Sequence, residues 1–481
     1  MSKKPLLKEI SEYLQHKYLG FHTPGHQQGK GSEKSFSQLF QQVFLKMDLT
    51  ELPGLDNLKN PRGCLRESQS LAANLFGAVE TFYLVNGSTV GLQAALLALN
   101  SPGGKVIIPR HAHLSVLNGL VLSGGSPLLV PVHLEKTWGI PWGVSPEKLT
   151  FWLEKEEDVD LVLTVQPTYQ GVGFAAGSIN KLVKEKGVSH VVDEAHGAHL
   201  FFQECLPLSL QKEHADVVVQ STHKTLSALT QASMLHVNNN QLVAPVRAAL
   251  NILQTTSPSY LLLASLDSVQ SQMRFRGPSL VDRVLELADL LRKEIRKIPG
   301  YRVFPEEKLP PGWYYDPAKV LVSAAPLGLT GWELAELLKE KQGIVVEMCD
   351  YFSVLFLITL GHTYEDIKKV RSALWKIRRE KRKKPLSACA YPACIYEQPL
   401  HLVLTPREVY YNRKEAKKIT EVEGRICGEA LTVYPPGIPC LWPGQLIEKE
   451  HVEYLKWVLG NNLELQGVSE NGEITIVQEK K

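Results

Sequence analysis

The sequence predicts an α/β fold built on a mainly parallel sheet with helices on both faces. Short apolar runs alternate with longer helical patterns from about Thr81 onward. The expected strands are Phe82–Val85, Lys105–Ile108, Pro127–Val132, Leu161–Val165, His190–Val192 and Val217–Gln220. Several of these runs are almost wholly apolar, which is typical of parallel strands that are buried on both faces. The helices expected between them are Val90–Leu99, His113–Leu122, Pro146–Lys155 and Ile179–Lys186.

Length and composition indicate a globular chain with several packed units. The 481 residues exceed the roughly 250–300 at which a single core stops growing. Hydrophobic residues make up 44% and charged residues 21%, which excludes a disordered or fibrous protein. With 53 basic and 50 acidic residues, the net charge of +3 selects no partner by bulk charge.

The chain divides by pattern into four expected units. Residues 1–50 form an N-terminal segment, 51–300 a large sheet domain, 301–385 a smaller α+β domain, and 386–481 a C-terminal module. A long amphipathic helix is expected at Pro278–Ile298, with Gly300 after its end. The helical stretch Gly361–Lys384 ends in a basic run, which we interpret as a solvated helix end because it lacks the interleaved aromatic residues of a nucleic-acid site.

The N-terminal pattern, the lengths of the apolar stretches and the cysteines together predict a cytoplasmic protein. Residues 1–15 show an amphipathic helix pattern without the apolar core of a signal peptide. No apolar stretch approaches the ~20 residues of a membrane-spanning helix. Seven cysteines in no framework spacing indicate reduced thiols. Cys389 and Cys394 lack the second ligand pair of a zinc site, so no metal is expected there.

Polar residues directly after the expected strands are the candidate site, because open α/β sheets bind ligands beyond the carboxyl ends of their strands. After the first strand, Gly87 permits a tight turn, and Ser88 and Thr89 open a helix. Backbone N–H groups and hydroxyls at such a helix start can hold an anion. An ordinary helix cap would have the same sequence.

Histidines and acids follow two further strands. An imidazole in the stretch 109–113, which contains His111 and His113, could stack on a flat ring, although a surface histidine would read the same way. Asp193 follows an apolar run, and a carboxylate buried there needs a cation. The stretch 193–199 also suggests a metal site. However, His196 and His199 are three apart with glycine between them, which is not the spacing of a metal-binding helix.

Lys224 lies in Ser221-Thr222-His223-Lys224-Thr225, immediately after the last expected strand. A solvent-facing loop lysine is the plain alternative. A partly desolvated lysine, however, has a lowered pKa, as a Schiff-base nucleophile requires. An anion cradle, a stacking ring, a carboxylate and a lysine, in that order, are the parts of a pyridoxal-phosphate pocket. The carboxylate would keep the pyridine nitrogen protonated, so that the ring accepts electrons.

The chain resembles the fold type I pyridoxal-phosphate decarboxylases that act on ornithine, lysine and arginine, in their short bacterial form without an N-terminal wing domain. The resemblance covers nearly the whole chain. The motifs that carry it are Phe21–His26, Asp48–Leu58, Leu84–Thr89, Val192–Gly197, Ser221–Thr225, Thr255–Tyr260 and Tyr434–Pro439. Each motif alone is weak, whereas all of them in the same order are specific.

The resemblance implies a role for each candidate residue. Lys224 would hold the cofactor as a Schiff base, Asp193 would pair with the pyridine nitrogen, and His113 would stack on the ring. His196 would lie near the ring hydroxyl. The phosphate would be held at the turn of Gly87 by Ser88, Thr89, Ser221 and His223. Ser257 would reach the phosphate of the partner subunit, which implies a homodimer with shared sites.

The expected reaction is decarboxylation of a basic amino acid, first of all arginine to agmatine in polyamine biosynthesis, then lysine or ornithine. The carbon left after loss of carbon dioxide would be protonated by Lys224 or a histidine. Because fold does not fix reaction, an aminotransferase, a lyase or a non-catalytic binding protein remains an alternative.

Two sets of residues bear on the choice of substrate. The acids that could read a basic side chain are Asp48, Glu51, Asp56 and Glu448. Three residues depart from the family pattern. We expect Leu114 and Gln27 to alter surface or rim charge, and Gln445 to lie near the substrate entrance.

Overall fold

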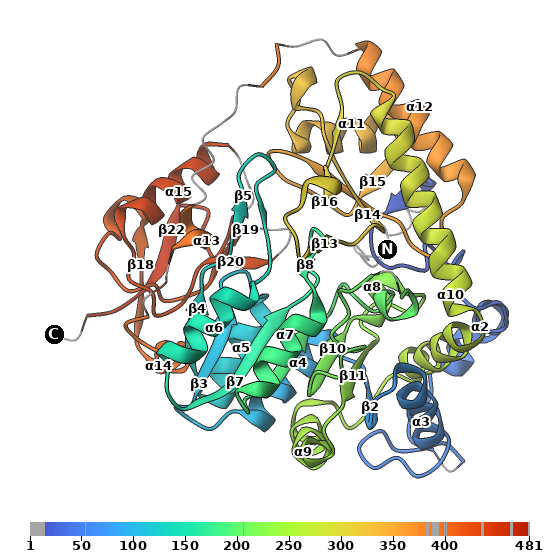
Figure 1. Ribbon diagram of the computed structural model, residues 1–481, viewed down its shortest axis with the longest axis horizontal. Coiled ribbons are helices and arrows are strands. Elements are labelled where there is room, and N and C mark those ends of the chain that lie inside the picture. The colour runs from blue at the N-terminus through green and yellow to red at the C-terminus, as the bar shows by residue number, and fades with distance from the viewer. Residues whose placement is uncertain are drawn as a thin grey trace, which may run out of the picture.

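The largest element of the computed structural model is a seven-stranded sheet (Figure 1). The structure describes residues 15–479 apart from 53, 205, 381–383, 387–393, 399, 401, 434–436 and 462–464. The strand order is β2-β11-β10-β9-β7-β3-β4. Their bounds are β2 Glu80–Leu84, β3 Lys105–Pro109, β4 Ser126–Val130, β7 Val159–Val165, β9 Ser189–Asp193, β10 Val217–Gln220 and β11 Ser233–Val237. All six predicted strands are present, so the mainly parallel α/β fold is confirmed.

Strand β11 was missed, and it is the antiparallel member of this sheet. It pairs antiparallel with both β10 and β2. The chain between β10 and β11, residues 221–232, contains the single helical turn α8, which carries Lys224, and no longer helix that could cross back over the sheet for a parallel return. The loop that presents the lysine therefore returns the chain antiparallel.

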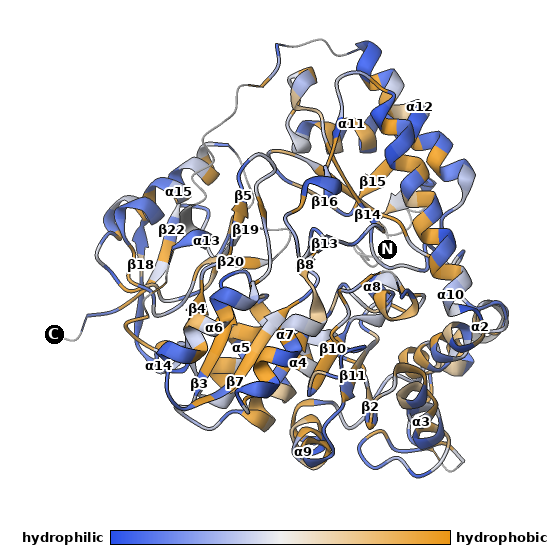
Figure 2. Ribbon diagram, viewed as in Figure 1, coloured by the Kyte–Doolittle hydropathy of each residue, from blue (hydrophilic) through white to orange (hydrophobic). Residues whose placement is uncertain are grey.

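Helices cover both faces of the sheet, and the strand residues alternate between the two layers. The predicted helices are found as α4 Gly87–Leu99, α5 Leu114–Ser123, α6 Pro146–Lys155 and α7 Ala176–Glu185, and α9 Val243–Leu253 joins them. In β10, Val217 and Val219 pack in the same cluster as α4, α5 and α9. Val218 lies in the opposite cluster with α6 and α7. Both faces are therefore buried, and the strands are coloured apolar in Figure 2.

The long helix α10 spans Tyr260–Arg296, so its predicted start at Pro278 is wrong. The buried stripe already runs through Leu263, Leu266 and Val269 and continues beyond the proline. Pro278 removes one backbone donor, but burial of this stripe on both sides holds the 37-residue helix together. Figure 1 shows it passing from beside α3 up to the smaller sheet.

A four-stranded sheet of order β12-β14-β17-β16 follows α10. Its bounds are β12 Arg302–Val303, β14 Lys319–Ser323, β16 Met348–Cys349 and β17 Val354–Leu357, with helices α11 Gly331–Gln342 and α12 Tyr364–Glu380. Strand β1 (Leu19–Phe21) pairs parallel with β15 (Ile344–Val346), which places the N-terminal segment against this unit. Helix α12 ends before the predicted residue 384, at the edge of the described residues.

The C-terminal residues form a separate cluster of small elements. These are α13 Cys394–Glu397, α14 Pro406–Tyr411, β18 Lys414–Lys418, β19 Leu431–Val433, β20 Ile438–Leu441, α15 Lys449–Gly460, β21 Leu465–Gln466 and β22 Glu473–Val477. They enclose their own apolar core. Trp442 instead packs into the core beside α4 and α5, which anchors the cluster to the large sheet.

Connecting elements complete the fold. They are α2 Lys34–Val43, α3 Cys64–Phe76, the hairpin β5 Leu134–Glu135 with β6 Ile140–Pro141, the pair β8 Val172–Phe174 with β13 Trp313–Tyr315, and the single turn α8 Thr222–Thr225. The boundaries predicted at residues 50, 300 and 385 stay predictions.

Some predicted features fall on residues that the structure does not describe. These are the helix expected in residues 1–15 (all but its last residue), Cys205, Cys389, the side chain of Cys394, and residues 434–436 of the C-terminal motif. Four cysteines within the described part, Cys64, Cys349, Cys427 and Cys440, are free thiols. In the same part, each helix is too short or too polar to cross a bilayer.

Candidate active site

Lys224 lies in the single turn α8, directly beyond the carboxyl end of β10. Its Nζ is 3.0 Å from Nε2 of His196. Burial lowers the pKa of Lys224, while the nearby carboxylates of Asp193 and Glu347 raise it. The lysine is therefore a desolvated amine held beside two negative charges, as the sequence predicts for a nucleophile.

Asp193 ends β9, the strand next to β10 in the sheet. Its side chain is 5% exposed and accepts a hydrogen bond of 3.1 Å from the backbone N–H of Ala195. Burial raises the pKa of this carboxyl, and Lys224 opposes the rise. Both residues line one pocket, whose other lining residues are Ser88, His111, His113, Val165, Pro167, Tyr169, Ala195, His196 and Ile438.

An open helix start lies at the rim of the same pocket. Gly87 begins α4 with φ 70°, and the cap residue Asn86 makes no side-chain hydrogen bond to the first turn. The hydroxyl of Ser221 donates to that of Ser88 at 2.8 Å, which joins two of the predicted phosphate-binding groups. Thr89 follows in the same half-buried turn. Free N–H groups with hydroxyls beside them favour an anion here.

Three histidines surround the lysine, and desolvation lowers the pKa of all three. Burial and Lys224 lower the pKa of His196 well below its ordinary value. Burial lowers that of His223 to about 4, and its Nδ1 donates to the carbonyl of Ala232 at 3.0 Å. His113 is the exposed member, and its Nδ1 caps α5 by accepting from the N–H of Ser115 at 3.1 Å.

Tyr169, which lines the pocket, and Glu347, which hydrogen-bonds it, were missed by the sequence analysis. The ring of Tyr169 lies 4.5 Å from that of His196, and its hydroxyl donates to Oε1 of Glu347 at 2.8 Å. The second oxygen of Glu347 accepts from the N–H of Thr23 at 2.7 Å. The threonine belongs to the recognised N-terminal motif, but no pattern connects residues 169 and 347, which lie 178 positions apart.

His111 was passed over in favour of His113, yet it lines the same pocket. It is 2% exposed, and neither ring nitrogen finds a partner in the described part of the chain. Burial lowers its pKa to about 4, so the ring is neutral at pH 7.

A buried charge cluster supports this wall from behind. Nζ of Lys319 donates to the carbonyls of Thr168 at 3.2 Å and of Tyr169 at 2.5 Å. Asp316 accepts from Nε2 of His199 at 2.9 Å. Lys319 and Asp316 are completely buried. Burial lowers the pKa of Lys319 to about 8, although Asp316 raises it.

The N-terminal motif packs directly on the lysine turn. The N–H of Gly25 donates to the carbonyl of His223 at 2.8 Å. A Cβ atom at Gly25 would lie 2.4 Å from the carbonyl oxygen of Leu226 and 2.8 Å from that of Lys224. Glycine is required because the two backbones touch. This contact gives a structural reason for the N-terminal motif, which the sequence analysis identified by resemblance alone.

The structure does not bring every predicted residue to this pocket. Ser257 is exposed between α9 and α10 and does not line the pocket of its own chain. The four candidate acids are also absent from its lining. Asp56 instead accepts backbone N–H groups from residues 57, 62, 63 and 66, and Glu51 accepts from Asn57 and Leu58.

Two of the three departures from the family pattern were misplaced. Gln27 is 7% exposed and donates to the carbonyl of His22 at 2.5 Å, so it changes no surface charge. Gln445 is 2% exposed and hydrogen-bonds Nε2 of His451 at 2.7 Å inside the C-terminal cluster. A neutral amide suits a buried position, because a carboxylate there would need a cation. Leu114 is half-buried at the start of α5.

The described residues fit a pyridoxal-phosphate group. A buried carboxylate with one hydrogen bond at its edge, a desolvated amine, and an open helix start all converge on the same pocket. Such a set offers a partner for a protonated ring nitrogen, an amine for a carbonyl carbon and an anion cradle for a phosphate. The geometry is that of covalent amine chemistry.

Comparison with known proteins agrees with this geometry. Residues 4–308 match the family described as "Orn/Lys/Arg decarboxylase, major domain", and residues 391–473 match its C-terminal domain. A protein of Bacillus subtilis named arginine decarboxylase is 34% identical over 99% of this chain and 98% of its own length. One from Bacillus anthracis with the same name is 32% identical over 96% and 94%.

Solved structures show the same fold. The constitutive lysine decarboxylase of Escherichia coli superposes with a TM-score of 0.79 at 20% identity, covering 99% of this chain and 82% of its own. A Pseudomonas fluorescens L-threonine transaldolase, solved in its internal aldimine state, gives 0.59 at 14% identity, covering 79% and 87%. Family and fold together imply pyridoxal phosphate as the cofactor and a free amino acid, a small molecule, as the substrate. The chain is a decarboxylase and belongs to the Orn/Lys/Arg decarboxylase family.

Proposed function

We propose that this chain converts L-arginine to agmatine and carbon dioxide with pyridoxal phosphate held at Lys224. The observation that carries the proposal is the contact of 3.0 Å between Lys224 and His196 in a pocket that also holds the buried Asp193. Arginine is favoured over lysine because four relatives at 32–34% identity are named arginine decarboxylases, whereas the relatives named lysine decarboxylases are 23–24% identical.

Each pocket residue has one task in this proposal. Lys224 binds the cofactor through its Nζ, Asp193 keeps a proton on the ring nitrogen, and His113 covers one face of the ring. The hydroxyls of Ser88, Thr89 and Ser221, with His223, bind the phosphate at the N-terminus of α4. When bound, the cofactor supplies an electron sink for the bond between Cα and the carboxylate.

The protein controls the proton that replaces the carboxylate. His196 is neutral at pH 7, because burial lowers its pKa well below 6.5. Its Nε2, 3.0 Å from Nζ of Lys224, therefore positions that nitrogen and is not the proton donor to carbon. Burial lowers the pKa of Lys224 while Asp193 and Glu347 oppose the fall, which suits Nζ both to take up a proton and to give it back. We assign proton donation to Lys224 and the positioning of its Nζ to His196.

Glu347 is our candidate for attracting a cationic substrate. Neither the four acids expected from the sequence nor Glu347 itself lines the pocket. The charge of Glu347 reaches the site, because it raises the pKa of both Lys224 and Lys319. Its hydrogen bonds to Tyr169 and Thr23 fix the carboxylate at the wall.

We also propose a cytoplasmic homodimer in which Ser257 completes the phosphate site of the partner subunit. Ser257 is exposed and lies away from its own pocket. The hydroxyl is therefore free to serve a neighbouring chain. Sedimentation at several concentrations tests the dimer, and mixing a Ser257→Ala chain with a Lys224→Ala chain tests sharing, since a mixed dimer should regain one intact site.

The deciding experiment adds arginine, lysine and ornithine separately to the purified protein and measures carbon dioxide and amine products. We expect carbon dioxide and agmatine from arginine, together with a visible cofactor absorbance that Lys224→Ala loses. Carbon dioxide from lysine alone would replace the substrate and keep the reaction. Transfer of the amine to a keto acid without carbon dioxide would replace decarboxylation with transamination.

A further inference from the structure

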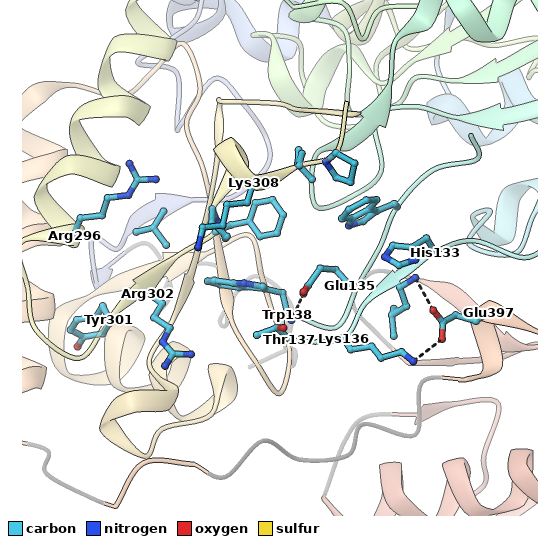
Figure 3. A pocket seen from close by; sticks show the side chains of 17 residues that line it. His133, Glu135, Lys136, Thr137, Trp138, Arg296, Tyr301, Arg302, Lys308 and Glu397 are labelled. Atoms are coloured by element: carbon cyan, nitrogen blue, oxygen red, sulfur yellow. Dashed lines mark hydrogen bonds and ion pairs between the residues drawn. The ribbon is translucent and has the colours of Figure 1, made fainter. Parts of the chain in front are cut away.

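A second cavity, of about 890 Å³, lies outside the catalytic pocket. It is bounded by the β5–β6 hairpin of the large sheet unit, by residues 296–310 around β12, and by Glu397 of α13 (Figure 3). None of its lining residues lines the catalytic pocket. Its volume falls within the roughly 300–1,000 Å³ that small-molecule sites occupy.

One wall of this cavity is aromatic and firmly packed. Trp138 meets Phe304 edge-on, with ring centroids 5.6 Å apart, and Trp142 packs against Trp313 at 5.1 Å. These rings belong to one buried cluster that also contains Tyr315. The cavity therefore presents flat apolar surface whose side chains lose little freedom when a planar ring packs on them.

The polar lining carries an excess of positive charge. Its acids are already used, because Glu397 pairs with Lys136 at 3.5 Å and Glu135 accepts from the N–H of Trp138 at 2.7 Å. Arg302 and Lys308 are exposed and have no carboxylate partner in the described part of the chain. In the view of Figure 3, the indole ring of Trp138 is drawn between the side chains of Lys308 and Arg302.

We propose that this cavity binds a heteroaromatic phosphate, with the ring against Trp138 and the phosphate between Arg302 and Lys308. Guanidinium and ammonium groups are the side chains that proteins use for phosphates. Aromatic walls bind planar rings by offset or edge contacts. A ligand with a ring and a phosphate contacts both the aromatic wall and the two cationic side chains, whereas arginine, a cation, is repelled by those side chains.

The test is titration of the full-length protein with AMP, adenosine and inorganic phosphate, followed by tryptophan fluorescence and calorimetry. AMP should bind at least tenfold more tightly than adenosine or phosphate, and more weakly at high salt. The double variant Arg302→Gln/Lys308→Gln should weaken AMP at least tenfold. The matched control is Lys376→Gln/Arg379→Gln, which removes the same charge from the exposed face of α12 and should leave binding unchanged.

Two further arms separate this site from the catalytic pocket. Lys224→Ala should bind AMP as the wild type does, so the result does not depend on the proposed reaction. Pyridoxine 5′-phosphate, which has a smaller ring and no aldehyde, distinguishes a nucleotide site from a site for free vitamin phosphates. Absence of AMP binding at millimolar concentration, equal binding of AMP and phosphate, or equal loss in the control variant would each overturn the proposal.

Discussion

Replacing Lys319 by methionine should destabilise the protein by about 3–5 kcal/mol, because removing one of two buried opposite charges leaves the other, Asp316, uncompensated. Lys319 and Asp316 are both fully buried. Without the ammonium, Asp316 retains His199 at 2.9 Å and the N–H of Ala318 at 3.0 Å. The carbonyls of Thr168 and Tyr169 lose a charged donor at the same time. Methionine matches the length of the lysine stem, so little of the loss comes from packing.

The double variant Lys319→Met/Asp316→Asn separates the cost of an uncompensated buried charge from the other effects of the two substitutions. It removes both members of the pair while asparagine keeps an acceptor for Ala318 and His199. We expect it to be less destabilised than the sum of the two single variants by about 0.5–3 kcal/mol, the range found for residues in contact. Urea unfolding followed by circular dichroism and by tryptophan fluorescence gives each free energy.

The same variants report on catalysis. Lys319 holds the backbone of residues 168 and 169, and the ring of Tyr169 lines the pocket. Lys319→Met should therefore lower kcat by a larger fraction than it lowers the absorbance of the cofactor bound at Lys224. A loss of unfolding free energy below about 1 kcal/mol, within the range of an ordinary hydrogen bond, or strictly additive single variants, would refute the compensation that we assign to this pair.

Further predictions follow from single contacts. Gly25→Ala should weaken cofactor retention and stability, because the new Cβ would lie 2.4 Å from the carbonyl oxygen of Leu226, whereas Gly460→Ala, with nothing within 4 Å, should match wild type in thermal unfolding and absorbance. Glu347→Gln should lower the pKa of Lys224, since Glu347 raises it; the pH dependence of amine labelling at Lys224 in apoprotein, read by mass spectrometry, should shift downward, and an unchanged midpoint would contradict this. Asp316 has a lowered folded pKa, so its stabilisation is present above pH ~4 and is lost as the pH falls. The stability difference between wild type and Asp316→Asn should accordingly shrink in acid, which urea unfolding from pH 7 to 3 measures.

The sequence predicts the sheet because its strands are buried on both faces and read as apolar runs of nearly correct length. The runs at 105–108 and 217–220 need almost no correction. Strand β11 was missed since Ser233 and His236 interrupt its apolar pattern. Both residues are nevertheless buried, and the ring of His236 hydrogen-bonds the hydroxyl of Thr81. The start of α10 was misplaced because Pro278 looks like a boundary when only local patterns are considered.

The residues of the candidate site likewise fall into those that a local sequence pattern predicts and those that only long-range packing places. Lys224, Asp193 and the helix start at Gly87 each follow a strand, so sheet topology brings them together without any long-range information. Tyr169 lies on the wall, and Glu347 and Lys319 hydrogen-bond residue 169 through contacts between units that are distant in the chain. Their positions depend on how β8, β13 and β15 pack, and no local pattern encodes that packing.

The N-terminal segment shows why the site needs more than the sheet. Its strand β1 pairs with β15, which ends at Val346 directly before Glu347, while Gly25 packs on the turn that carries Lys224. Thr23, between them, donates its N–H to Glu347. One short segment therefore fixes the distance between the lysine and the carboxylate that raises its pKa. A decarboxylase must supply a proton to the carbon left behind by carbon dioxide, and this segment holds Glu347 where its charge opposes the fall in the Lys224 pKa that burial causes.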